Sequence, residues 1–148
     1  MNSLSHNPTF VAYAIACLVL CGNLLLLWGY SGAVRNRVKA TPNSEDVSLF
    51  GGTHAEADPP AIARVLRAHS NAQASIYPFL FLGLIYVLAD GGATLGITYF
   101  AVFSAARLLH SYAYVTGKQP WRTICFAAGA LATGVLMLND AWLLFGAL

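Results

Sequence analysis

Residues 64–89 read RVLRAHSNAQASIYPFLFLGLIYVLA, and this stretch decides what kind of protein the chain is. From Ala72 onward it is almost wholly apolar and approaches the length of about 20 residues that a helix needs to cross a bilayer. Its first half instead carries Arg64, Arg67 and Asn71 at positions i, i+3 and i+7, which share one helix face. Insertion scales assign a cation at the bilayer centre a penalty of about 2.5–3.5 kcal/mol, so these polar residues require a reason.

The same spacing returns in a later apolar segment. Arg107, His110 and Tyr114 again stand at i, i+3 and i+7, and Arg122 opens the last apolar segment. One explanation is ion pairing between helices. The other is an anionic ligand held among the helices, and the small number of acidic residues nearby favours it.

Composition places the chain among membrane proteins. Hydrophobic residues make up 57% of its 148 residues and charged residues only 9%, whereas soluble proteins carry about 25% charged residues. The net charge of +2 is too small to indicate nucleic-acid binding, and the three cysteines lack the spacing of metal ligands. The length suggests a single domain.

Four segments have the length and hydropathy of transmembrane helices. They are 8–34, 60–89, 93–115 and 121–145, separated by a polar connection at 35–59 and by two short turns that contain glycine. The sequence therefore predicts an all-α membrane protein with four transmembrane helices in one domain covering 1–148.

The basic residues predict the orientation in the membrane. They flank one side of the predicted spans: Arg35, Arg37, Lys39, Lys118 and Arg122. The opposite side carries Asp90 and Asp140, which we expect to be solvated, and no lysine or arginine. The positive-inside rule then places 35–59 and 117–121 in the cytoplasm and both termini on the other side. In a bacterium this would be the inner membrane, and in a eukaryote the endoplasmic reticulum.

Several stretches together resemble the MAPEG family, the membrane-associated proteins of eicosanoid and glutathione metabolism. RVLRAHSN at 64–71 followed by IYPFLFLG at 76–83 is similar to the second helix of that family. RLLHSYAY at 107–114 is similar to its third helix, and 117–123 to the turn and fourth helix that follow. NSED at 43–46 followed by Gly51 and Gly52 matches its cytoplasmic loop, so the resemblance covers nearly the whole chain.

This resemblance implies a four-helix bundle assembled as a homotrimer, with glutathione bound between neighbouring subunits on the cytoplasmic side. It implies an enzyme, with prostaglandin E synthase-like isomerisation or glutathione transferase or peroxidase activity on lipophilic electrophiles that enter from the membrane lipids. The implied glutathione contacts are Arg35, Arg67, Asn71, His110, Tyr114 and Arg122. Arg35 would be contributed by one subunit to the site of its neighbour.

The resemblance also implies roles at the thiol. Arg122 matches an arginine beside the sulfur, where its fixed charge would favour the thiolate, which is the reactive form. Thr123 stands where the family has a serine proposed to assist the thiol, and Asp46 matches a loop aspartate proposed to transfer a proton.

Four positions depart from the family pattern. Ala63 and Ala74 replace glutamates of the second helix, Ser70 replaces an arginine, and Phe126 replaces a tyrosine. The loss at Ala74 removes a carboxylate that commonly meets the glutathione amine. A non-catalytic module that binds a lipid is therefore the alternative function, although a module without turnover would have no need of Arg122.

Overall fold

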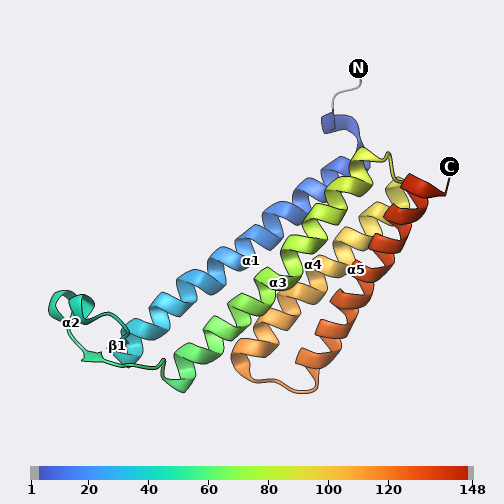
Figure 1. The fold of residues 1–148 in the computed structure, drawn as a ribbon. Helices are drawn as coiled ribbons and strands as arrows, with labels where there is room; N and C mark the ends of the chain where they lie inside the picture. The colour runs from blue at the N-terminus through green and yellow to red at the C-terminus, as the bar shows by residue number, and fades with distance from the viewer. Residues whose placement is uncertain (1–3, 147–148) are drawn as a thin grey trace.

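The computed structural model describes residues 4–146, almost all of them in helices (Figure 1). The elements, in chain order, are the 3-10 helix η1 (Leu4–His6), α1 (Pro8–Val38), β1 (Ala40–Thr41), α2 (Ser44–Phe50), β2 (Thr53–His54), α3 (Pro60–Leu88), α4 (Ala93–Thr116) and α5 (Trp121–Phe145).

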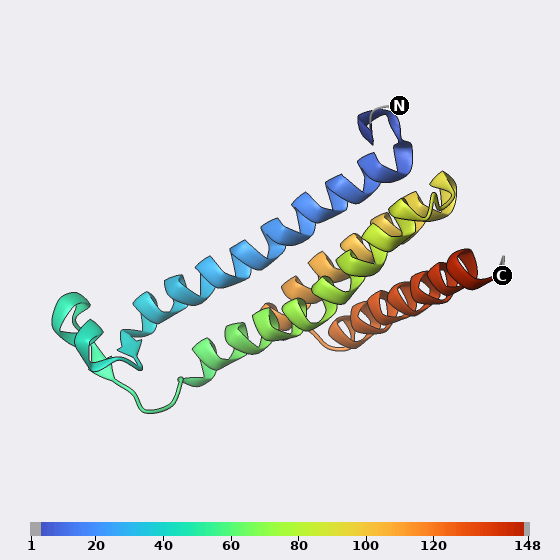
Figure 2. The same ribbon diagram turned by 45° about the horizontal axis from the view of Figure 1, so that its top comes forward.

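The four long helices lie side by side, with α3 and α4 in the middle (Figures 1 and 2). Helix α1 packs on α3 and α4 from one side, and α5 packs on the same two helices from the other. Over the described residues α1 and α5 do not contact each other. Both ends of the chain lie at one end of the molecule, and the α1–α3 connection and the α4–α5 turn lie at the opposite end.

The first helix is longer than the predicted segment 8–34. The Asn7 side chain caps its start by accepting from the backbone N–H of Thr9 at 2.9 Å and of Phe10 at 3.2 Å. The helix continues to Val38 and ends where Lys39 adopts the left-handed conformation, at φ 53°. Residues 35–38 contain no glycine or proline, so nothing in them stops the helix before this C-cap.

The predicted loop at 35–59 between the first two long helices is therefore shorter than expected, and it contains regular structure. After α1, strands β1 and β2 pair in parallel, and the Thr53 N–H donates to the Lys39 carbonyl at 2.9 Å. Buried Ala40 packs with Val34 of α1 and with Ile62 and Val65 of α3. The connection is thus fixed to the ends of both helices, and it carries α2 with Asp46 in its first turn.

Aromatic side chains fill the centre of the packed helices. The rings of Phe79 and Phe103 stack with centroids 3.6 Å apart, and Phe100 meets Phe79 edge-on at 6.0 Å. Close to the end that carries the chain termini, Tyr86 packs against Phe100 and donates from its hydroxyl to the Gly92 carbonyl at 2.8 Å. These contacts join α3 and α4 over the half of each helix that is nearer the turn between them.

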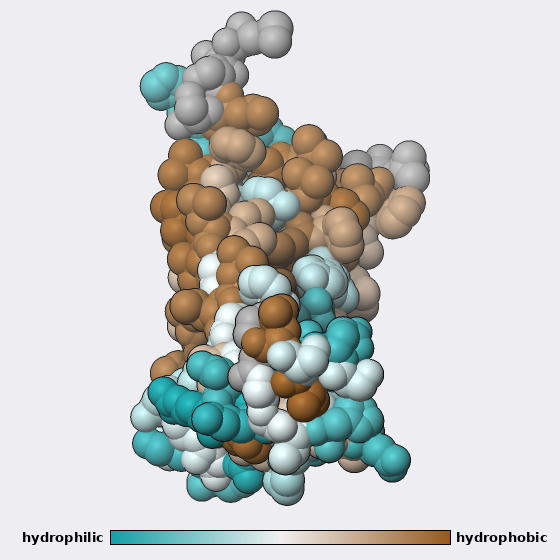
Figure 3. Space-filling model, turned by 90° about the vertical axis from the view of Figure 1, so that its left-hand side faces the viewer, coloured by the Kyte–Doolittle hydropathy of each residue, from teal (hydrophilic) through white to brown (hydrophobic). Residues whose placement is uncertain are grey.

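The outer faces of the helices are strongly apolar. Exposed hydrophobic side chains cover α1, α3 and α5, and Figure 3 shows hydrophobic surface above a hydrophilic end where α2 lies. Among the described residues three helices, α1, α3 and α5, are long and apolar enough to cross a membrane, and α4 is less apolar than these three. The chain is therefore an α-helical membrane protein.

Asp140 does not lie where the sequence suggested. We expected it to be solvated, but it is only 3% exposed, and neither of its carboxylate oxygens has a hydrogen-bond partner in the described part of the chain. Asp140 is buried because of its position on the helix. It lies on the same face of α5 as the buried residues Gly129, Ala132 and Leu136, which precede it at intervals of three or four residues.

A pair of phenylalanines on α3 tests this packing. Phe79→Ala removes a ring that is 0% exposed, so we expect the free energy of unfolding to fall by about 3–5 kcal/mol. Phe81→Ala changes a side chain that is 70% exposed and serves as the matched control. Thermal unfolding in detergent measures both variants, and equal losses would contradict the packing described here.

Candidate functional site

An arginine–aromatic cluster occupies the space between α4 and α5 near the turn that joins them. It consists of Arg107, His110, Tyr114, Arg122 and Phe126. The Arg122 guanidinium lies over the Tyr114 ring, 4.9 Å from its centroid. The His110 ring lies 5.6 Å from Tyr114 and 6.1 Å from Phe126, measured between centroids. The structure thus brings together three residues predicted to bind glutathione, namely His110, Tyr114 and Arg122.

Gln119 holds the start of α5. With its amide oxygen turned toward Arg122, it accepts from Nη2 at 2.6 Å and from Nε at 3.1 Å, and its nitrogen donates to the Thr123 hydroxyl at 3.1 Å. In that orientation the Thr123 oxygen is an acceptor and keeps its own proton for another partner. Thr123 is exposed, so both groups predicted to act on a thiol are held by one amide at the surface.

Arg107 is buried much more deeply than the other cations, with 1% of its surface exposed. Its Nη1 donates to the Ser75 hydroxyl at 2.6 Å, and the guanidinium lies 5.7 Å from the Phe103 ring centroid and 5.6 Å from that of Phe126. Its Nε has no hydrogen-bond partner among the residues that the structure describes. Gly129 faces this edge, because a Cβ there would stand 3.0 Å from Nε and 3.2 Å from Nη2.

Helix α3 contributes Arg67 and Asn71 one turn apart. Arg67 is exposed, whereas Asn71 is half-buried, and within residues 4–146 its Oδ1 atom lacks a hydrogen-bond partner. Asn71 lines a groove of about 540 Å³ between α3 and α5, with Arg107 on its wall. We refer to this cavity as the α3–α5 groove.

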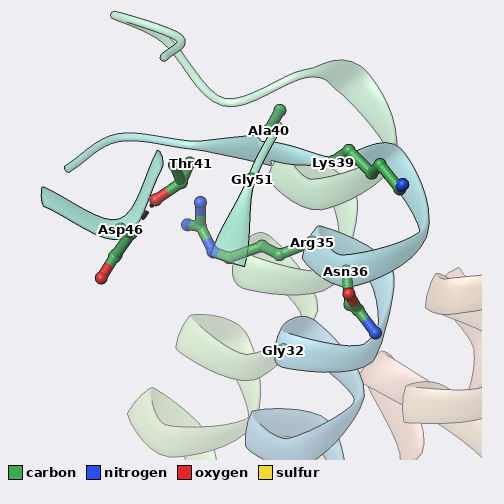
Figure 4. Close-up of a pocket in the computed structure, with 8 residues that line it drawn as sticks. All are labelled: Gly32, Arg35, Asn36, Lys39, Ala40, Thr41, Asp46 and Gly51. Atoms are coloured by element: carbon green, nitrogen blue, oxygen red, sulfur yellow. Dashed lines mark hydrogen bonds between the residues drawn. The ribbon is translucent and has the colours of Figure 1, made fainter. Parts of the chain in front are cut away.

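The remaining predicted residues lie around a second cavity at the end of α1. Figure 4 shows this pocket of about 430 Å³, lined by Arg35, Lys39 and Asp46 among others. Arg35 forms an ion pair with Asp58 at 2.8 Å. The Asp46 carboxylate accepts from the Thr41 hydroxyl at 3.1 Å and from the Asn43 amide at 3.0 Å.

Within one chain the predicted site is therefore divided in two. Arg35 and Asp46 belong to α1 and the connection after it, whereas Arg122 and Thr123 belong to α5, which α1 does not contact over the described residues. Figure 1 shows α2 and the start of α5 on opposite sides of the molecule. A single chain does not bring Asp46 to Arg122.

The two parts of the predicted site differ in how their arginines are paired. Over residues 4–146 the one ion pair joins Arg35 to Asp58, so Arg67, Arg107 and Arg122 have no carboxylate partner there. Aromatic rings, the Ser75 hydroxyl and the Gln119 amide hold Arg107 and Arg122 instead. The arrangement can accept an anion without first breaking a salt bridge.

Sequence reasoning missed three residues that shape the cluster, namely Ser75, Gln119 and Gly129. Gln119 stands three residues before Arg122 and four before Thr123, and this spacing brings side chains together around the start of a helix. The contact of Gln119 with these two residues could therefore have been predicted from the sequence. Ser75 and Gly129 meet Arg107 across helices, and only the packing of α3 and α5 on α4 reveals them.

The contact between Arg122 and Tyr114 can be measured directly. A double-mutant cycle of Tyr114→Leu with Arg122→Gln should give a coupling of about 0.5–1 kcal/mol in the free energy of unfolding, because the ring face attracts the cation. In the control cycle, Tyr114→Phe with Arg122→Gln, an aromatic ring remains at position 114 throughout. The coupling energy measured in this cycle should therefore be close to zero. Equal coupling in the two cycles would mean that the ring face has no role.

Comparison with known proteins identifies the family of this chain. The family model described as "MAPEG family" matches residues 13–142. The chain is 35% identical to a prostaglandin E synthase of Equus caballus over 136 residues, which cover 87% of this chain and 88% of the relative.

Two further relatives cover similar lengths. A prostaglandin E synthase of Homo sapiens is 33% identical over 145 residues, covering 93% of this chain and 95% of that protein. A microsomal glutathione S-transferase 1 of Sus scrofa is 32% identical over 134 residues, covering 87% and 86%. A family match over most of the chain, together with relatives of this identity and coverage, assigns the protein to the MAPEG family.

Proposed function

We propose that this chain is a membrane enzyme that uses glutathione to conjugate or isomerise lipophilic electrophiles. The names of its relatives support this reaction class, since they include prostaglandin E synthases and a microsomal glutathione S-transferase. The observation that carries the proposal for this chain is Arg122, held over Tyr114 by Gln119 and paired with no carboxylate of residues 4–146.

Glutathione would bind as an anion along the unpaired cations. Its two carboxylates suit arginine, because guanidinium and carboxylate make bidentate, charge-assisted hydrogen bonds. Arg67, Asn71, His110 and Tyr114 would contact the tripeptide from α3 and α4, with Arg122 at the sulfur. The unpaired Oδ1 of Asn71 is an acceptor available to a ligand N–H.

The catalytic step needs the thiolate, since the thiol is a poor nucleophile. A guanidinium does not lose its proton at physiological pH, so Arg122 would stabilise the sulfur anion by charge. The Thr123 hydroxyl, whose oxygen accepts from Gln119, would donate a hydrogen bond to the same sulfur. The thiolate then forms a bond to the electrophilic carbon, and the leaving group departs with the electron pair of the broken bond.

The division of the site supports an oligomer in which neighbouring subunits complete it, and the family resemblance makes that oligomer a homotrimer. Arg35 lies on α1, away from Arg122, so one subunit would supply Arg35 and Asp46 and the next would supply the arginine–aromatic cluster. The ion pair of Arg35 with Asp58 holds the arginine at the end of α1, next to the pocket that contains Asp46.

The membrane arrangement follows from the same residues. All four long helices would cross the bilayer, because α4 packs along the other three and joins α3 and α5 by short turns at opposite ends. The arginine-rich end with α2 would face the cytoplasm by the positive-inside rule. Glutathione would then reach the site from water and the electrophile from lipid.

Binding of a lipid without turnover is the second candidate function. Ala74 favours it, because it stands where the family pattern has a glutamate and it lines the largely apolar α3–α5 groove. A protein that only binds a lipid would have no use for Arg122 and the exposed Thr123 next to it.

Turnover separates the two candidates. In detergent micelles the wild type should conjugate glutathione to chlorodinitrobenzene, with chloride as the leaving group. Arg122→Ala should lower kcat/KM by about tenfold or more, as expected for the loss of a charge-assisted contact to the thiolate. Arg37→Ala, which removes an exposed arginine outside both parts of the site, is the matched control.

Two results would count against the enzyme. The first is the absence of both conjugation and calorimetric glutathione binding in the wild type, which would favour the lipid-binding module. The second is an Arg122→Ala variant as active as Arg37→Ala, which would remove the proposed role of the guanidinium.

Co-expression tests whether subunits share the site. Arg35→Ala and Arg122→Ala should each lose most of the activity alone, but mixed oligomers should regain activity at about a quarter of their sites, the fraction expected from random assembly. The purified mixture is assayed for conjugation against each variant alone. Mixed oligomers with no recovered activity would place both arginines in a site within one chain.

A further inference from the structure

An apolar groove of about 580 Å³ lies between α1 and α4, and we refer to it as the α1–α4 groove. Most of its lining is leucine, glycine and alanine, and its Asn23 and Ser111 side chains are bonded to each other at 3.0 Å. On α1 the lining runs from Asn23 to Ala33, a rise of about 15 Å, which equals half of the hydrocarbon thickness of about 30 Å of a bilayer. The groove therefore has the length of one lipid leaflet.

A second cavity continues this groove at the helix ends. It has a volume of about 370 Å³ and shares Tyr30 and Val115 with the α1–α4 groove, and Arg37 and Arg64 also line it. Arg37 is the last residue but one of α1, and Arg64 lies near the start of α3. We refer to this cavity as the basic pocket. The apolar groove thus leads to two guanidinium groups at the end of the helices.

Lys118 adds a third cation at the same end. Its ammonium lies 5.1 Å from the Tyr112 ring centroid and donates to the Tyr112 hydroxyl at 3.4 Å. Arg64 lies against the residue before it, because a Cβ at Gly117 would stand 2.5 Å from Nη1 of Arg64. Arg37, Arg64 and Lys118 are exposed, and no carboxylate of residues 4–146 pairs with them. The charge at this end of the groove is therefore positive and accessible.

Both cavities face away from the proposed catalytic site. Arg37 follows Arg35 by two residues, which turns its side chain about 200° around α1. Tyr112 stands two residues from His110 and two from Tyr114, so it points away from both on α4 by the same angle of about 200°. The α1–α4 groove and the basic pocket therefore form a surface separate from the arginine–aromatic cluster.

The combination of the two cavities selects a phospholipid of net negative charge. Phosphate oxygens accept charge-assisted hydrogen bonds from guanidinium and ammonium groups, and basic pockets at the cytoplasmic ends of transmembrane helices bind anionic headgroups. A soluble phosphate would leave the apolar groove empty. Phosphatidylcholine brings a fixed cation, which three neighbouring cations repel.

We propose that the basic pocket and the α1–α4 groove together bind one anionic phospholipid per chain. Its phosphate lies between Arg37 and Arg64, with Lys118 beside the headgroup, and one acyl chain lies along the groove from Tyr30 toward Asn23. Tyr30, where the two cavities meet, then stands at the level of the membrane interface, where tyrosine is enriched. This inference does not rest on the proposed function, because no proposed catalytic step uses these residues.

Native mass spectrometry of the full chain in detergent counts the bound lipids. The protein is titrated with equal amounts of phosphatidylglycerol and phosphatidylcholine that carry the same acyl chains. We expect the first lipid bound per chain to be phosphatidylglycerol, preferred by about tenfold or more. Glycerol 3-phosphate, compared with sodium chloride at equal ionic strength, should not displace it, because it has no acyl chain.

Two variants with matched controls locate the site. Arg37→Gln combined with Arg64→Gln should lower the affinity for phosphatidylglycerol by about tenfold or more, whereas Arg67→Gln changes an exposed arginine of α3 that lines neither cavity and should bind as the wild type does. Gly29→Phe keeps every cation but fills the groove from an exposed position, where a Cβ meets no atom within 4 Å, and should abolish the first binding event. Gly22→Phe makes the same change on α1 outside the groove, also with open space around the Cβ.

Each outcome decides the proposal. It is overturned if the wild type binds the two lipids equally, if glycerol 3-phosphate displaces phosphatidylglycerol, if the double arginine variant keeps the preference, or if Gly29→Phe binds as tightly as Gly22→Phe does. Gly29→Phe decides the question even if the double arginine variant does not assemble. Conjugation is not measured, so failure of the lipid site and failure of the proposed enzyme remain distinguishable.

Discussion

The arrangement of this protein depends on how it keeps arginine side chains in apolar helices without acids to neutralise them. Arg107 is buried against two phenylalanine rings and a serine hydroxyl, and Arg122 lies on a tyrosine ring beside a glutamine amide. Each of these partners holds a guanidinium without cancelling its charge. The helices α3, α4 and α5 therefore pack around positive charge that an anionic ligand can still use.

The two parts of the site follow from the way the helices pack. Because α3 and α4 separate α1 from α5, the basic end of α1 and the start of α5 lie on different sides of one molecule. Each side presents cations at the hydrophilic end and apolar surface above it. A second copy is the simplest element that can bring these sides together, and it would also cover apolar surface that a single chain leaves exposed.

Much of this organisation could be predicted from the sequence. The limits of α3, α4 and α5 follow hydropathy, proline and glycine, which are local signals, whereas α1 runs four residues past its predicted end. Arg107, His110 and Tyr114 share a helix face by spacing alone. The folding of 40–59 against α1 and the burial of Asp140 were not predicted. Both depend on contacts between helices and on helical phase, which a pattern along one segment does not contain.

The proposed site was predictable to a similar degree. Family resemblance pointed to the residues, but it could not show that Asp46 and Arg122 lie apart in one chain, that Gln119 holds Arg122, or that Ser75 meets Arg107. Those facts come from side chains that are distant in sequence or specific to this chain. The contacts of Gln119 and Ser75 explain how an arginine that has no carboxylate partner is still held in place.

The ionisation of bound glutathione tests the central claim most directly. Thiolate absorbance, followed against pH for the glutathione-saturated protein, should show a pKa for the bound thiol below the value of about 8.5 typical of a free thiol, because an unpaired guanidinium favours the anion. Titration of the bound thiol at the free value would contradict the claim that these helices hold their arginines for a thiolate.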